Sequence, residues 1–137
     1  MMTFLDDVLN DDSDYVEKLI KMTEYTFENM KKDEIFAYRY YFFLSNVFMK
    51  AESGELPPKC KAPPHVRMYA FFEEGIKRGA FKDKYDPSEC AKLYNCIIQG
   101  ATINFILCPK EFKHTFKFPS IQYITDIFKK ETADDQN

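Results

Sequence analysis

The chain has 137 residues, with 19 Lys and Arg against 22 Asp and Glu, for a formal net charge of −3. This length suits one domain, and a content of 45% hydrophobic and 17% aromatic residues excludes a disordered chain. A pI near 5.4 argues against a free-standing nucleic-acid binder. No apolar run approaches the ~18 residues of a membrane span, and the first residues lack the basic and apolar regions of a secretory signal. We therefore expect a cytoplasmic protein with reduced cysteines and no membrane partner.

Prolines separate five segments that have helical periodicity. The first covers residues 13–30, has one apolar and one polar face, and is expected to be capped by Asp12 or Ser13. The second covers residues 34–50, follows Asp33 as its expected N-cap, and is apolar nearly all round. A helix of that kind is expected to be central and buried.

The later segments have sharper boundaries. The third helix is predicted over 64–78, with Gly79 placed to satisfy its last carbonyl groups. The sequence from Asp86 to Glu89 supplies an acidic N-cap, a proline at the first helical position and a glutamate at the third, and the helix runs to about Leu107. A fifth helix is predicted over 119–130. Because no segment alternates with period two, we predict an all-α fold, a five-helix or six-helix antiparallel bundle.

The fourth helix has an unusually broad apolar arc. Its polar residues form only a narrow strip, made of Lys92, Asn95, Gln99 and Thr102. Such a helix should pack on two sides, and one of these sides can be another subunit. Asn104 lies inside the apolar arc, where a polar group needs a partner, in a dimer interface or in the core.

The segment between the third and fourth helices resembles a known family. Phe72-Glu73-Glu74-Gly75-Ile76-Lys77-Arg78-Gly79-Ala80-Phe81 leads through Lys82-Asp83-Lys84-Tyr85 to Asp86-Pro87. It is similar to the turn into the penultimate long helix of TetR-type transcriptional repressors, in which an "EGI..G.F" helix end is commonly followed by an acidic-Pro cap. The motif covers about residues 71–100, and the helical layout extends the likeness over 13–130.

The resemblance implies the C-terminal ligand-binding and dimerisation domain of such a repressor. It implies a homodimer that binds a small, mostly apolar effector, and contact with DNA only through a helix-turn-helix that this sequence does not contain. The expected organisation is an N-terminal extension (1–12), a helical regulatory and dimerisation domain (13–131) and a polar tail (132–137). A stand-alone helical protein-interaction module without DNA-binding activity is the alternative.

Two sets of candidate site residues follow from these patterns. Aromatic and apolar side chains, with tyrosine hydroxyls and one histidine to orient a ligand, form the candidate effector site: Phe36, Tyr40, Phe43, His65, Tyr69, Phe72, Tyr94 and Ile98. Core packing is the simpler explanation for any one of them. The small and apolar residues of the last two helices form the candidate dimer interface: Leu93, Ile97, Gly100, Ala101, Asn104, Ile121, Ile124 and Phe128.

Little in the sequence indicates catalysis or a metal. The closest pairs of potential zinc ligands, Cys90 with Cys96 and Cys60 with His65, are six and five residues apart, which does not match the spacings of zinc sites. We predict no metal, no cofactor and no enzymatic activity, although a cysteine-based enzyme or redox sensor stays open as a third hypothesis. Residues 110–118 alternate basic and aromatic side chains, and we interpret them as a loop that places its aromatics on the core rather than on nucleic acid.

Overall fold

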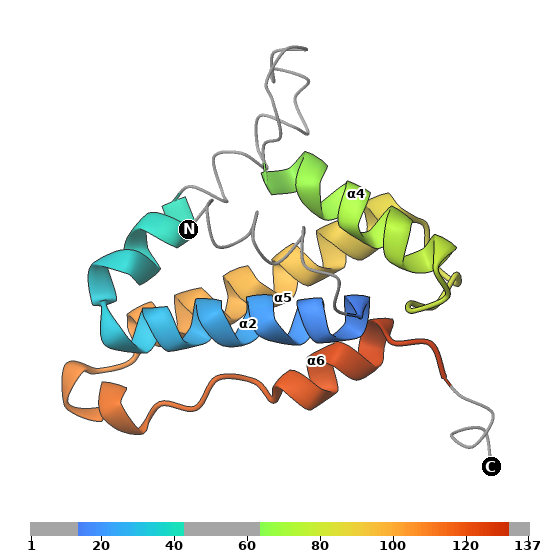
Figure 1. The fold of residues 1–137 in the computed structure, drawn as a ribbon. Helices are drawn as coiled ribbons and strands as arrows, with labels where there is room; N and C mark the ends of the chain where they lie inside the picture. The colour runs from blue at the N-terminus through green and yellow to red at the C-terminus, as the bar shows by residue number, and fades with distance from the viewer. Residues whose placement is uncertain (1–13, 43–63, 132–137) are drawn as a thin grey trace.

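The computed structural model describes residues 14–42 and 64–131, and their regular elements are helices. In chain order these are α2 (Tyr15–Lys32), a helical segment over 34–42, α4 (Pro64–Lys77), α5 (Pro87–Leu107), the 3-10 helix η1 (Lys110–Thr115) and α6 (Ile121–Phe128) (Figure 1). The described residues contain no β-strand beyond one isolated bridge between Phe81 and Lys129. The all-α prediction is therefore confirmed for this part of the chain.

Local capping determines where the first two helices begin. The Asp14 side chain accepts from the Val16 amide at 3.1 Å, so α2 starts slightly later than the predicted cap at Asp12 or Ser13. The Asp33 carboxylate accepts from the Ile35 amide at 3.0 Å, which confirms Asp33 as the cap of the next helical segment. The predicted continuation of that helix to residue 50 lies outside the described residues.

The turn between α4 and α5 follows the sequence signals closely. Gly79 has φ of 77°, a left-handed conformation that favours glycine, and its amide donates to the Ile76 carbonyl at 3.0 Å. The Asp86 carboxylate accepts from the Glu89 amide at 2.8 Å and caps α5. Both predicted boundaries are confirmed.

The C-terminal segment differs from the prediction. α6 begins after Ser120, whose hydroxyl accepts from the Tyr123 amide, and it is shorter than the helix expected over 119–130. The helix η1 was not expected. Backbone hydrogen bonds from Lys82 to the Phe128 carbonyl and from Lys130 to the Ala80 carbonyl tie the end of α6 to the α4–α5 turn. None of the described helices is both long and apolar enough to cross a bilayer.

Helices α2 and α5 run side by side in the same direction. The hydroxyls of Thr23 and Tyr94 are 2.8 Å apart, and the Thr102 hydroxyl donates to the Met30 sulfur at 3.5 Å. Each contact joins residues about 71 positions apart in the sequence, which requires a parallel pair. The expected antiparallel bundle is therefore wrong for this pair, because the chain between them includes α4, which returns it to the starting end.

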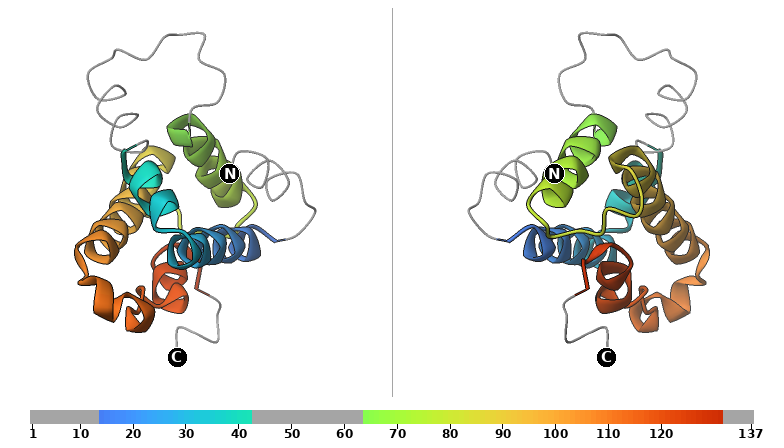
Figure 2. Two further views of the ribbon diagram at one scale, coloured as in Figure 1. Left: turned by 90° about the vertical axis from the view of Figure 1, so that its left-hand side faces the viewer. Right: turned by 90° about the vertical axis from the view of Figure 1, so that its right-hand side faces the viewer.

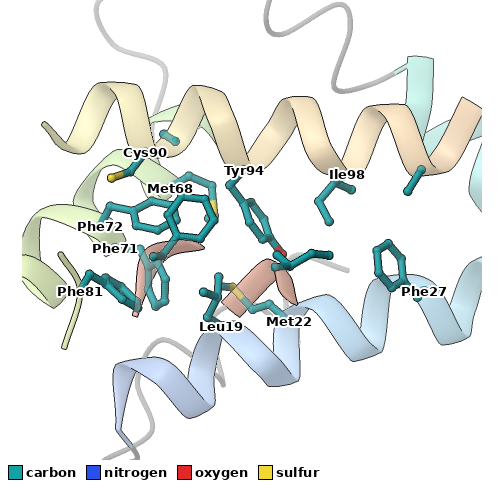
Figure 3. Packing of buried hydrophobic residues seen from close by; sticks show 14 residues of the cluster. Leu19, Met22, Phe27, Met68, Phe71, Phe72, Phe81, Cys90, Tyr94 and Ile98 are labelled. Carbon is teal, nitrogen blue, oxygen red and sulfur yellow. The ribbon is translucent and has the colours of Figure 1, made fainter. Parts of the chain in front are cut away.

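The main core lies between α2 and α5, with α4 on one side and α6 on the other (Figures 1 and 2). Phe72 is fully buried at its centre, and its ring lies 5.3 Å from Phe81, 5.0 Å from Phe128 and 6.2 Å from Tyr94, measured between centroids. Figure 3 shows Phe72, Phe81 and Tyr94 converging from different elements. Buried aromatic pairs of this kind add about 0.5–1.5 kcal/mol each beyond their area.

A second cluster closes the other end of the molecule. Phe105 is buried and contacts Phe116 and Phe118 at centroid distances of 5.4 and 5.3 Å, while Phe118 stacks on Phe27 at 4.5 Å. Two of the aromatics of 110–118 thus pack on the core, as the sequence indicated, whereas Phe112 is 57% exposed.

Candidate functional site

The predicted effector-site residues do not share one environment. Phe72, Tyr94 and Ile98 are buried at 0%, 4% and 0% exposure within the main core, whereas Tyr69 is 39% exposed on α4. The partly buried side chains of Phe36 and Tyr40 pack on the second cluster, with their rings 5.9 Å apart, and Tyr40 also packs on the main core. Phe43 and the side chain of His65 lie outside the described residues. The structure therefore places part of this set in the core, and the set as a ligand site stays a prediction.

Tyrosine hydroxyls form a buried polar group between α2 and α5. The Thr23 hydroxyl donates to the Leu19 carbonyl at 2.8 Å, so the Tyr94 hydroxyl is the donor in its 2.8 Å contact with Thr23. Figure 3 shows Tyr94 reaching from α5 toward α2. Burial, and then the neighbouring Tyr40, raise the pKa of Tyr94 above the ordinary value of a phenol.

Tyr40 belongs to the same neighbourhood. Burial of its phenol raises the pKa of Tyr40 to about 12, and a hydrogen bond with Thr26 opposes this shift. Both tyrosines are therefore neutral at physiological pH and serve as hydrogen-bonding groups rather than as bases. Helices α2 and α5 and the 34–42 segment are held around them.

Two amide side chains on α5 each have an enclosed nitrogen atom without a partner. The Nδ2 atom of Asn95 and the Nε2 atom of Gln99 form no hydrogen bond; Asn95 is only 3% exposed, and Gln99 is half-buried. The two residues are one helical turn apart on the same side of α5. A buried amide group without a hydrogen-bond partner costs about 1–3 kcal/mol, so these two residues lower the free energy of unfolding. Of the polar strip predicted on this helix, Asn95 and Thr102 are buried, and Lys92 and Gln99 are half-buried.

The opposite side of α5 is exposed and uncharged. The fifteen residues from Leu93 to Leu107 include no Asp, Glu, Lys, Arg or His. At 100° per residue, all the exposed ones and two of the half-buried ones share about a third of the helix surface, whereas the half-buried Gln99 and Ile106 lie outside it. We call this surface the α5 face, and it consists of Leu93, Cys96, Ile97, Gly100, Ile103, Asn104 and Leu107.

The predicted dimer interface is divided by the fold. Its members on the α5 face are exposed or half-buried: Leu93, Ile97, Gly100 and Asn104. Ala101, Ile124 and Phe128 are at most 4% exposed because they fill the core of the same chain, and Ile121 packs partly against it. These core positions offer almost no surface to a second copy. Cys96, Ile103 and Leu107 were missing from the predicted interface, although the 100° periodicity starting at Leu93 could have identified them.

The described cysteines differ in accessibility. Cys90 is buried, and burial, together with the charges of Asp86 and Glu89, raises the pKa of its thiol. That thiol is a poor nucleophile at neutral pH. Cys96 is exposed on the α5 face and Cys108 is half-buried, while Cys60 lies outside the described residues. Among the described side chains, no group of three or more His, Cys, Asp or Glu is placed to hold a metal ion.

Comparisons with known proteins add no family assignment. No family model matches the chain, and searches of curated proteins and of solved structures found no significant match. The likeness to TetR-type repressors therefore depends on residues 72–87 and on the order of the helices. The α5 face and the buried polar groups are the features of the structure that bear on function.

The buried tyrosines predict a loss of stability in alkali. Because their folded-state pKa values exceed the unfolded value of about 10, the contribution of these two phenols to the free energy of unfolding should be flat below pH 10 and fall above it, toward pH 12. The slope should be about 1.4 kcal/mol per pH unit for each phenol. Denaturant titrations at several pH values should show a shallower slope for Tyr94→Phe. The matched Tyr123→Phe change, at a side chain that is 75% exposed, should leave the slope as in the wild type; equal slopes in all three proteins would contradict this.

The orphaned amide predicts a stabilising substitution. Asn95→Leu removes an unpaired buried donor while keeping the number and branching of side-chain heavy atoms, and it should raise the free energy of unfolding by about 1 kcal/mol, measured with a chemical denaturant. The control is Asn29→Leu, because the Asn29 amide donates to the Tyr25 carbonyl at 2.8 Å and its removal should bring no gain. A loss of stability in Asn95→Leu would show that this amide is satisfied in solution.

Proposed function

We propose that this chain is the regulatory domain of a cytoplasmic TetR-type transcriptional regulator, which pairs with a second copy through the α5 face and binds a small, mostly apolar effector. The observation that carries the proposal is the uncharged, partly exposed α5 face. DNA would be contacted through a helix-turn-helix outside this sequence. The family resemblance at 72–87 supports the assignment, since the family pairs its subunits through its last two long helices, the first of which follows this turn.

The pairing function has a simple physical basis. A surface helix of a monomer usually presents charged and polar residues to water, but α5 presents Leu93, Ile97 and Leu107 with no charge among them. Leu93 is 38% and Leu107 is 74% exposed, so apolar surface is left uncovered along about 21 Å of helix. Contiguous exposed apolar surface of this kind typically marks a protein interface.

The sensing function is supported by the buried polar groups. Ligand sites are mostly apolar and contain a few polar groups that orient the ligand. The amides of Asn95 and Gln99 lack partners, and they lie on the same helix as the α5 face. A molecule that satisfied them would act on the helix through which two copies pair. It would change the placement of the subunits only by binding one arrangement better than the other.

One observation favours the alternative, a helical interaction module that pairs copies but binds no effector. Phe72, Tyr94 and Ile98, three of the side chains expected to contact a ligand, fill the core of the chain. Because these side chains pack against one another, they leave no room for a ligand between them. The two functions share the α5 face and differ in whether the interior accepts a small molecule.

The pairing function predicts a dimer that one charge disrupts. Light scattering on a sizing column should give about twice 16.2 kDa for the wild type. Leu93→Asp should give a monomer, because two carboxylates would be buried at the interface. Leu93 suits this test better than Ile97, which also packs on the core. The control is Ile35→Asp, a more exposed apolar residue near a helix start, which should remain dimeric. A monomeric wild type would exclude the pairing function.

The sensing function predicts an interior site for an apolar anion. Anilinonaphthalene sulfonate should bind with a saturable rise in fluorescence, at one molecule per chain, to both the wild type and Leu93→Asp. Saturable binding to the wild-type dimer, whose α5 faces are covered, separates interior binding from binding to the exposed α5 face. A signal that appears only in Leu93→Asp, or no saturable signal in either protein, would favour the interaction module.

A further inference from the structure

We infer that the second copy packs with its α5 antiparallel to the first, and that the two helices cross at Gly100. This inference rests on the proposed pairing through the α5 face and specifies the geometry of that pairing. Two independent features of α5 lead to it, the environment of Gly100 and the uneven exposure of the two ends, and the helical repeat then sets which residues meet.

No contact within its own chain explains why residue 100 is a glycine. A Cβ atom built at this position meets no atom within 4 Å, whereas at Gly75 it would collide with the Phe81 ring. Glycine in a helix interior is destabilising relative to alanine, so another residue at this position would make the single chain more stable. The missing side chain is useful where a second helix approaches closely from outside.

In any α-helix the positions three, four and seven residues on either side of a residue share its face, so a crossing at Gly100 sets which positions meet. The pairs are Ile97 with Ile103, Cys96 with Asn104, and Leu93 with Leu107. A two-fold axis through Gly100 and perpendicular to the helix brings each position opposite its mirror position on the partner. A homodimer uses the same surface on both subunits, and this arrangement makes the surface complementary to itself.

The uneven exposure of the two ends favours the antiparallel orientation. Leu93 is 38% exposed and Leu107 is 74% exposed, so one end of the face is recessed and the other protrudes. An antiparallel pair seats the protruding Leu107 of each copy against the recessed Leu93 end of the other. A parallel pair would bring the two protruding ends together and leave the recessed ends apart. Opposed helix dipoles add a smaller preference in the same direction.

The chemistry of the α5 face favours a second copy of this chain as its binding partner. The face has no formal charge over the fifteen residues from Leu93 to Leu107, so an acidic or basic partner finds no counter-charge there. An identical face offers equal length, equal lack of charge and a glycine at the same midpoint.

Disulfide trapping distinguishes the two orientations. In the antiparallel pair, Cys96 lies close to Asn104 of the other copy, whereas the two copies of Cys96 are about 12 Å apart along the helix, beyond the reach of a disulfide. The starting protein carries Cys60→Ser and Cys108→Ser. With copper phenanthroline and dissolved oxygen as the oxidant, which takes up the two electrons and two protons of each thiol pair, this protein should stay uncrosslinked. After the further change Asn104→Cys it should form a covalent dimer on non-reducing gels.

Three other results of the crosslinking and light-scattering measurements would contradict the inference or the pairing function on which it rests. Crosslinking through Cys96 alone would establish a parallel pair and overturn the inference. A dimer in light scattering that is trapped in neither protein would place the contact elsewhere and would also overturn it. A monomer in light scattering would instead remove the proposed pairing function itself.

Enlarging the crossing residue provides a second, independent measurement. Gly100→Leu should leave the fold of the chain intact, since nothing lies within 4 Å of that position. It should raise the dissociation constant of the dimer at least about tenfold, because two added side chains meet at the crossing. An unchanged dissociation constant would place the crossing away from Gly100.

Discussion

The structure depends on the packing of aromatic rings around Phe72. This fully buried side chain of α4 contacts Tyr94 of α5, Phe128 of α6 and Phe81 of the α4–α5 turn. Four segments distant in sequence are thereby held against α2 by dispersion and by removal of apolar surface from water. Because interiors pack at high density, this arrangement determines how α5 is rotated about its own axis.

The rotation of α5 decides which of its residues are available for function. The side that carries Tyr94 and Ile98 is used by the core, so Leu93, Gly100 and Leu107 are left on the outside. An apolar helix that packs on one side only leaves apolar surface in water, and association is the usual way to cover it. The same packing event that stabilises the chain therefore creates the surface proposed for pairing.

The interior also contains polar groups with different energetic consequences. The contact between the Thr23 and Tyr94 hydroxyls is satisfied, and it sets the register of two parallel helices that a purely apolar contact would leave free to slide. Asn95 and Gln99 are not satisfied and cost stability. Such costs are commonly found where a protein keeps a group for binding rather than for folding, which is why these amides are central to the proposed sensing function.

The all-α class and several helix ends could be predicted from the sequence, because the Asp33, Gly79 and Asp86 signals act through hydrogen bonds within one or two turns. The sequence also identified α5 as a helix with too much apolar surface for a single core. The parallel arrangement of α2 and α5, and the inward side of α5 with Asn95 and outward side with Leu107, could not be predicted because they depend on contacts formed on folding. A helix that is apolar over most of its circumference has no preferred buried side of its own, so contacts with Phe72 and Thr23, distant in the sequence, made that choice.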